Sequence, residues 1–459
     1  MDKRKVLTAT LAALILVFSA SCGQTTPVSP SSASETSAPA EVKAESPTNT
    51  PLPAPTEAKT EEQITLNVWF ITGNTTTLPE KLAQGFNAKY PNVKVEFSFY
   101  SFDDMNRSLR MALDGGTGPD VANASPGLTG TDAYARAGHL VDLTEIAKER
   151  GWDKHYSADL LTFANLFAPE KHVYGIPTTS STVGVYYNPE IFDKYGLKVP
   201  ETFDEFENIL ATLKADGVTP FSVGALDQWP LSHYWEQLIH LTTPFDELTR
   251  LFELDTTARF DSPTMIQAAA KLQEWAKKGY FAENYLATNF ADGNSLFITG
   301  KVAMNVGGTW VAYDFTQQPE FKAHFFPMPP MNPNMPWHAG GQSPDNNWIV
   351  SKYSKHQDVA INFVDYVLSE EGALLNWNEG NIVTYKFDKQ PPTITLLQGE
   401  IYAAMQKTGP GYYMGVTGEV LQAEGNLLQQ LCAGDLTPEK AMEELQKVFL
   451  ESIKNLGNP

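Results

Sequence analysis

The feature that most constrains the fold is an alternation of strand and helix patterns between residues 64 and 121. Apolar residues alternate with residues of the opposite face over 64–70 and 93–99, which predicts two strands. They recur at helical spacing over 82–90 and 105–113, which predicts two helices, and a third strand is expected at Val121. A β-α-β-α-β order implies parallel strands with crossover helices. It predicts a doubly wound α/β fold, in which ligands bind beyond the carboxyl ends of the strands.

A second α/β unit is expected farther along the chain. Thr202 and Glu205 form the pattern of a capping box at the start of a helix. Other patterns predict a strand at 222–223, a helix at 262–279, a helix end and strand at 297–306, and helices at 358–368 and from Pro438. Because one core rarely organises more than ~250 residues, a chain of 459 residues is expected to form two lobes.

The first 21 residues have the composition of a signal peptide. Three basic residues precede a mostly apolar run, 6–18, which is shorter than the ~20 residues of a membrane-spanning helix. Small residues then lead to Cys22, and this stretch resembles the lipobox of bacterial lipoproteins, in which the cysteine becomes the acylated first residue. Ser19 departs from that pattern, which usually has Leu there, and the alternative is an ordinary cleavage site with a coincidental cysteine.

The segment that follows Cys22 is expected to be an extended linker. Of the 40 residues from 23 to 62, 32 are Ser, Thr, Pro, Ala or Glu. This segment therefore has too few large apolar residues to form a core. Such a linker, 22–62 with the lipidated cysteine, would tether the folded part outside the membrane.

Charge and motif content exclude several classes of protein. The 33 Lys and Arg against 54 Asp and Glu give a net charge of −21, which disfavours nucleic acid as a partner. Two cysteines, Cys22 and Cys432, form neither a disulfide framework nor a Cys₄ zinc site. The chain has no HExxH, Walker, GxSxG or EF-hand pattern. We therefore expect no metal, no cofactor and no catalytic residue.

Nine short motifs stand in a specific order along the folded part of the chain. They are Leu66-Asn67-Val68-Trp69, Phe86 to Val95, Gly118-Pro119-Asp120-Val121, Gly138 to Leu143, Tyr174-Gly175-Ile176-Pro177 with Tyr186-Tyr187-Asn188, Pro200 to Glu205, Gly300 to Met304, Gly308-Thr309-Trp310, and Ala360 to Val364. In this order they resemble the extracellular solute-binding proteins of ABC importers, family 1, which are maltose-binding-protein-like.

The resemblance implies an α/β, two-lobe, periplasmic-binding-protein-like fold of type II, with a ligand cleft between lobes joined by hinge crossings. The N-terminal lobe would comprise 63–178 plus 349–378, and the C-terminal lobe 182–343 plus 384–459. Crossings are expected near 177–183, 341–348 and 377–384. At the third crossing the chain has Gly380-Asn381-Ile382-Val383, where the family often has Gly, an apolar residue and Pro.

The resemblance also implies a function. The protein would be a sugar-binding lipoprotein that holds a mono- or oligosaccharide and delivers it to an ABC permease and ATPase, without catalysis of its own. It would sit on the extracellular face of the cell membrane or in the periplasm, held by its lipid anchor alone. We expect a monomer.

Sugar sites combine planar side chains with hydrogen-bonding groups, because rings pack on the C–H faces and an unmatched buried hydroxyl partner costs about 1–3 kcal/mol. Trp310, after a Gly-Gly-Thr sequence, stands where the resemblance places a stacking platform, and Trp229 resembles a cleft aromatic. The alternative for both is a place in the core. Trp152, Trp235 and Trp275 have apolar neighbours at helical spacing and are expected in the core.

Polar cleft residues are expected from loops. Asn74 and Asp120 resemble sugar contacts, although Asp120 could instead cap the next turn. Asp345, Asn346 and Trp348 cluster in the second crossing, where a run of turn-forming residues is the alternative. Trp377 occupies the third crossing and completes the expected ligand-binding set.

Two other classes of protein stay open at this point. A cell-surface glycoside hydrolase or lyase would use paired carboxylates from distant loops, which no motif reveals. A surface adhesin, or the sensory partner of a receptor, would bind protein instead of a solute.

Overall fold

The computed structural model describes residues 63–71, 77–318, 320–331, 343–408 and 417–456. These belong to one compact unit, Thr60–Pro459, and the unit Met1–Lys59 precedes it. The predicted signal peptide, Cys22 and the linker lie outside the described residues, and so does Asn74. Among the described helices, none combines the length and the apolar composition needed to cross a bilayer.

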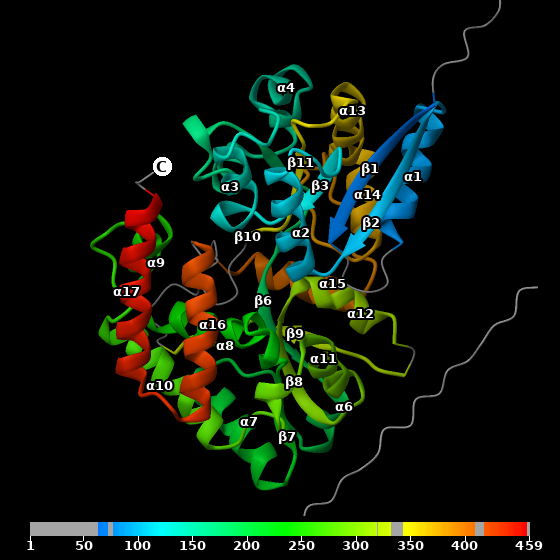
Figure 1. Cartoon of the computed structure of the whole chain (residues 1–459). Coiled ribbons are helices and arrows are strands. Elements are labelled where there is room, and N and C mark those ends of the chain that lie inside the picture. Colours follow the sequence, from blue (N-terminus) through cyan, green and yellow to red (C-terminus); the bar gives the residue numbers. More distant parts are fainter. Residues whose placement is uncertain (1–62, 72–76, 319, 332–342, 409–416, 457–459) are drawn as a thin grey trace, which may run out of the picture. The chain divides into compact units, whose positions relative to one another are not determined.

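The first sheet has five strands in the order β2-β1-β3-β11-β4 (Figure 1). The three strands β2, β1 and β3 are parallel, as the β-α-β-α-β pattern predicts, and β11 runs antiparallel to both β3 and β4. The elements of this region are β1 (Ile64–Ile71), α1 (Leu78–Lys89), β2 (Val93–Tyr100), α2 (Phe102–Asp114), β3 (Val121–Ala124), α3 (Thr131–Arg136), α4 (Thr144–Glu149), α5 (Ala158–Ala164), β4 (Gly175–Pro177), β11 (Asn347–Val350), α13 (Gln357–Leu368) and α14 (Glu370–Asn378).

Both faces of this sheet are covered. Alternate residues of β11, Trp348 and Val350, join the core that includes α1 and α13, whereas Ile349 joins the core that includes α2 and α3. Helices on both faces are the expected result of right-handed crossovers between parallel strands.

The second sheet has four strands in the order β7-β8-β6-β9, and the Thr202–Glu205 capping box begins α7 as predicted. The expected strand at 222–223 overlaps the end of β7. The elements of this region are β6 (Val183–Tyr187), α6 (Pro189–Lys194), α7 (Phe203–Ala215), β7 (Thr219–Ser222), η4 (Ala225–Asp227), α8 (Trp229–Thr242), α9 (Phe245–Phe252), α10 (Pro263–Lys277), α11 (Phe290–Ile298), β8 (Val302–Gly308), η6 (Thr309–Val311), α12 (Ala312–Thr316), β9 (His324–Phe326), α15 (Leu396–Met405), α16 (Gly418–Ala433) and α17 (Pro438–Leu456).

The largest core of the protein lies against this second sheet. Helix α8 is almost completely buried there, packed against α10 and α16. Trp235 and Trp275 are fully buried in this core, and Trp152 is buried in the core of the first sheet, so all three expectations are confirmed.

Three chain segments connect the two sheets side by side. Strand β5 (Ser180–Ser181) pairs antiparallel with β10 (Ser343–Pro344). On its other side, the Ser180 N–H donates to the carbonyl of Ile382 at 2.8 Å, and the Thr384 N–H donates to the carbonyl of Thr178 at 3.0 Å. Two lobes joined by three hydrogen-bonded crossings therefore form the expected α/β two-lobe fold.

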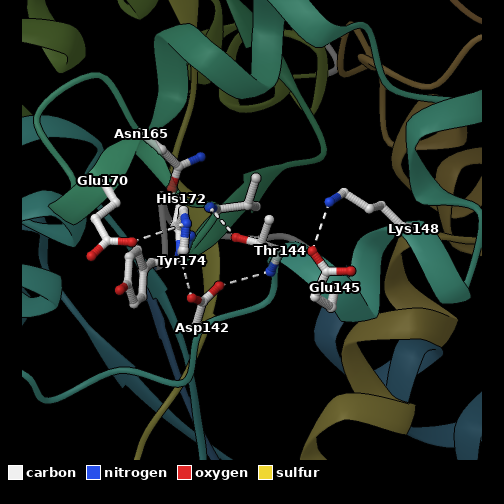
Figure 2. Close-up of polar contacts among 9 residues, drawn as sticks. Asp142, Thr144, Glu145, Lys148, Asn165, Glu170, His172 and Tyr174 are labelled. Carbon is white, nitrogen blue, oxygen red and sulfur yellow. Dashed lines mark hydrogen bonds and ion pairs between the residues drawn. The ribbon is translucent and has the colours of Figure 1, made fainter.

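The segment before the first crossing is held by a polar network (Figure 2). The buried Asn165 side chain accepts hydrogen bonds from the backbone N–H groups of Tyr174 and Gly175 at 2.9 and 3.0 Å. Its amide group donates to the carbonyls of Leu161 and Gly175, both at 2.9 Å. Farther out, His172 lies between Asp142 and Glu170, with 2.6 Å between His172 Nδ1 and Asp142 Oδ2. Asn165 thus fixes where β4 begins.

Replacing Asn165 should destabilise the first lobe. In Asn165→Ala, the buried N–H of Gly175 and the partly buried N–H of Tyr174 lose their acceptor, and we expect a loss of roughly 2 kcal/mol or more in the free energy of unfolding. The matched control is His172→Ala, which removes a half-exposed member of the same network and should cost less than about 1 kcal/mol. Urea denaturation of both variants measures the difference, and equal losses would contradict the role given to Asn165.

Candidate functional site

A cavity of about 600 Å³ lies between the two sheets and against all three crossings. It is within the size range of small-molecule sites. Asn123 of β3, Ile71 of β1 and Thr309 after β8 all line it, so the carboxyl ends of strands from both sheets face the cavity. This placement agrees with the expectation for a doubly wound fold.

Aromatic rings from the second lobe form one wall of the cavity. The ring centroids of Trp229 and Phe290 are 4.5 Å apart, and those of Trp229 and Trp310 are 6.3 Å apart. Phe102, from α2 of the first lobe, lies 6.4 Å from Trp229. Phe102 and Trp229, one from each lobe, therefore lie close together at the cavity with their ring planes tilted by 54°.

Local backbone features position the two tryptophans. A Cβ atom at Gly308 would overlap the Trp310 ring, so this ring position requires glycine there. Gln228 precedes Trp229 with φ 66° and ψ −63°, a rare conformation for a residue with a side chain. Its Nε2 donates to Asn426 Oδ1 at 2.7 Å, which anchors the start of α8 to α16. Backbone strain at a site of this kind indicates a position fixed by its surroundings.

One face of α8 supplies a polar stripe that the sequence analysis did not single out. His233, Glu236, Gln237 and His240 all line the cavity, along with Trp229 at the start of the same helix. Their spacing of three or four residues places them on one side of a helix. His233 Nδ1 lies 2.8 Å from Glu236 Oε2. The sequence signal that could have revealed this stripe is a set of polar residues at helical spacing within an otherwise apolar helix.

A second acid lies next to this stripe, in the core. Glu424 of α16 is fully buried, and burial followed by repulsion from Glu236 raises the pKa of Glu424 to about 8. Glu424 therefore holds a proton at neutral pH.

Two more carboxylates of the cavity are held by hydrogen bonds. Asp345 accepts from the N–H of Asn346 at 2.9 Å and from Thr179 Oγ1 at 3.3 Å, while burial raises its pKa. Burial opposes ionisation of Glu379 as well, but hydrogen bonds from Lys81 and Thr77 outweigh it and lower the Glu379 pKa. Lys81 Nζ is 2.6 Å from Glu379 Oε1.

Five of the expected ligand-binding residues line the cavity: Trp229, Trp310, Asp345, Asn346 and Trp348. Trp348 belongs mainly to the floor, because it is buried in β11 and its Nε1 donates to Thr178 Oγ1 at 3.2 Å. Because these five residues line the cavity, they are candidates for contact with a ligand.

Asp120 and Trp377, which were also expected at the ligand, are not among the residues that line this cavity. Asp120 accepts from the N–H of Asn67 at 2.8 Å and from Ser354 Oγ at 2.5 Å, so its carboxylate ties β1 and β3 to the end of β11. Trp377 is buried in α14, and its Nε1 donates to the carbonyl of Pro392 at 2.8 Å. The polar side chain that reaches the cavity from this turn is Glu379.

Across the described ranges, no group of three or more His, Cys, Asp or Glu side chains is placed to hold a metal ion. Cys432 is a free thiol, partly buried at the edge of the large core, where burial raises its pKa to about 12.

Comparison with known proteins identifies the family. Residues 71–374 match the sequence model of the family of bacterial extracellular solute-binding proteins. The chain belongs to this family. A relative from Streptococcus mutans, named multiple sugar-binding protein, is 27% identical over 298 residues, which are 63% of this chain and 67% of that protein.

Solved structures show the same fold. One named chitin oligosaccharide binding protein has a TM-score of 0.76 and 24% identity, and the match covers 85% of this chain and 99% of that chain. Another, from work on xylan utilization by the thermophilic bacterium Caldanaerobius polysaccharolyticus, has a TM-score of 0.74 and 26% identity, with 84% and 99% covered.

The buried acid pair predicts how the stability of this family member depends on pH. Because the Glu424 pKa rises from 4.5 to about 8 on folding, the folded protein keeps a proton that the unfolded chain releases in this window. The protonated Glu424 makes its full contribution to the free energy of unfolding below pH 4.5. This contribution is lost as the pH rises toward 8. The free energy of unfolding should fall by at most about 1.4 kcal/mol per pH unit in this range.

Glu424→Gln should flatten this slope, because the amide does not titrate. Glu419→Gln, an exposed change on the same helix, should leave the slope as it is in the unmodified protein. Urea denaturation at several pH values between about 5 and 8 measures both. A Glu424→Gln variant with the original slope would show that another group sets the pH dependence.

Proposed function

We propose that this protein is the carbohydrate-binding component of an ABC importer and performs no catalysis. The observation that carries this proposal is that Trp229 and Trp310 line a cavity between two lobes together with polar groups such as Asn123 and Asp345. Rings of this kind pack on the C–H faces of a sugar, and the polar groups exchange hydrogen bonds with its hydroxyls. The names of the Streptococcus mutans relative and the xylan-utilization structure are consistent with it.

Binding between lobes also suits delivery to a permease. Phe102 and Asp103 reach the cavity from the first lobe, and Trp229 and Trp310 reach it from the second. A solute that touches both sets stabilises the closed arrangement over the open one. A permease can then distinguish loaded protein from empty protein by the relative position of the lobes.

The function is tested by binding to a panel of neutral mono- and oligosaccharides. A thermal-shift screen should find a sugar that raises the melting temperature, since a ligand at 100 times its dissociation constant stabilises by about 2.7 kcal/mol. The sugar should be recovered unchanged after long incubation. A sugar that is cleaved would favour the alternative, a cell-surface glycoside hydrolase or lyase.

With the sugar in hand, the tryptophans can be tested by titration. Trp310→Ala should weaken binding by roughly 2 kcal/mol or more, about 30-fold in dissociation constant, because it removes a ring from the cavity wall. Trp229→Ala should act in the same direction. The control is Phe99→Ala, which removes an exposed ring outside the cavity and should leave the affinity unchanged. Affinity that survives both tryptophan changes would place the binding surface elsewhere.

The proposal includes a lipid anchor at Cys22 that holds the protein outside the cell membrane or in the periplasm. Its support is the sequence, in which a basic start, a short apolar run and small residues precede Cys22. Cys22→Ser should release the protein from the membrane fraction of the producing cells. Equal membrane association of the variant and the native protein would refute acylation.

A further inference from the structure

Helix α16 contacts the turn that carries Trp229. Trp229 is the first residue of α8, and the turn before it consists of η4 and Gln228. Gln429 Nε2 of α16 donates to the carbonyl of Ala225, where the turn begins, at 2.6 Å. Asn426 Oδ1 of α16 accepts from Gln228 Nε2, where the turn ends, at 2.7 Å. Two side chains of α16 therefore hold the turn at both of its ends.

The close approach of α16 to this turn depends on a glycine. Gly425 is buried within α16, at a position where alanine would favour the helix more than glycine does. A Cβ atom at Gly425 would lie 2.6 Å from Gln228 Cβ and 2.9 Å from Gln228 Oε1, which is closer than van der Waals contact allows. Because Gln228 Cβ is bonded directly to the backbone, it can move away only if the turn moves with it. Glycine at this position therefore lets α16 reach the turn.

The backbone conformation that α16 holds is an unfavourable one. Gln228 has φ 66° and ψ −63°, which is close to the γ-turn geometry that is rare and strained. A residue keeps such a geometry only where its surroundings hold it. The Gln228 N–H also donates to the carbonyl of Ala225 at 3.1 Å, but this hydrogen bond lies within the turn itself. The contacts with Asn426 and Gly425 supply restraint from outside the turn.

The other side of the turn is held by α11. Asp227 Oδ2 accepts from the N–H of Phe290, the first residue of α11, at 2.7 Å. The ring centroids of Phe290 and Trp229 are 4.5 Å apart, so α11 also limits where the Trp229 ring can lie. The turn is thus fixed between α11 and α16.

We propose that Gly425, Asn426 and Gln429 are positioning residues for sugar binding, which act through the turn and keep the Trp229 ring in place at the cavity. This inference rests on the proposed carbohydrate-binding function. The three residues are not among those that line the cavity, so they act without touching the sugar. A ring that is already held in its binding position loses less conformational freedom when a sugar packs on it. The affinity of the cavity therefore depends on a helix outside its lining.

The position of Trp229 can be followed without a sugar. In protein labelled with fluorotryptophan, the tryptophans give separate fluorine NMR resonances, and Trp229→Phe identifies the Trp229 resonance by its loss. Gly425→Ala adds the Cβ atom that collides with Gln228 and should shift this resonance. The matched control is Gly418→Ala in the same helix, where the added Cβ atom meets open space, and it should leave the resonance in place.

A second pair of variants tests the hydrogen bond to Gln228. Asn426→Ala removes the acceptor of Gln228 Nε2, whereas Asn426→Asp keeps an acceptor there. We expect the Trp229 resonance to shift in Asn426→Ala and to return toward its original position in Asn426→Asp. Because Asn426 is exposed, this pair leaves the core intact, and it decides the question if Gly425→Ala does not fold.

Isothermal titration then uses the neutral sugar that gives the largest thermal shift in the panel. Gly425→Ala and Asn426→Ala should each weaken its binding by about tenfold, because the Trp229 ring is no longer held in its binding position. Asn426→Asp and Gly418→Ala should bind it as the unmodified protein does. Circular dichroism confirms that each variant is folded.

The outcomes separate this inference from the proposed function. An unchanged Trp229 resonance in both Gly425→Ala and Asn426→Ala would overturn the inference, whether or not a sugar binds. Unchanged affinity in these two variants would also overturn it and leave the carbohydrate function standing, and so would an equal loss of affinity in Gly418→Ala. If no sugar of the panel binds the unmodified protein, the proposed function fails, and the binding role of α16 fails with it.

Discussion

The hydrogen-bonded junction of the three crossings is the constraint on which the rest of the structure depends. The pairing of β5 with β10, and the hydrogen bonds from Ser180 and Thr384 to the neighbouring strands, hold three distant parts of the chain in one place. Strands of the two sheets end near this junction, so their carboxyl ends face a common cavity. Rotation about a junction of short extended segments moves whole lobes without disturbing either core.

The cavity combines apolar and acidic groups, and the two kinds of group have different effects. The rings of Trp229, Trp310 and Phe290 supply contact area with little loss of side-chain freedom, because each has two rotatable bonds. The carboxylates give the cavity an acidic lining, which is unfavourable for anionic groups. Burial raises the pKa of Glu424, so this acid reduces the stability of the fold as the pH rises toward neutrality.

Much of the fold could be predicted from local patterns. The strands at 64–70 and 93–99, the capping box at Thr202 and the helix that begins at Pro438 all depend on neighbours within a few residues, and the structure has each of them. The site could be predicted only in part. Trp310 could be recognised because its place after Gly307-Gly308-Thr309 resembles the stacking position of the family. The α8 stripe was missed because its polar residues stand among the apolar residues of a buried helix.

The sequence by itself indicated the α/β class and the two lobes, because periodicity and turn chemistry are local properties. The expectation for Trp229 and Trp310 came from the resemblance to the family, and Phe102 and Phe290 were not expected at the cavity. Asp345 and Asn346 were expected at the cavity, whereas only the tertiary structure placed the other polar residues that line it. Asp120 is bound by Asn67 and Ser354, so its carboxylate is used within the first lobe, and Trp377 is buried, so Glu379 takes its place at the cavity. The physical reason is that a polar side chain can satisfy its hydrogen bonds within the fold or toward a ligand, and residues distant in sequence decide between these two uses.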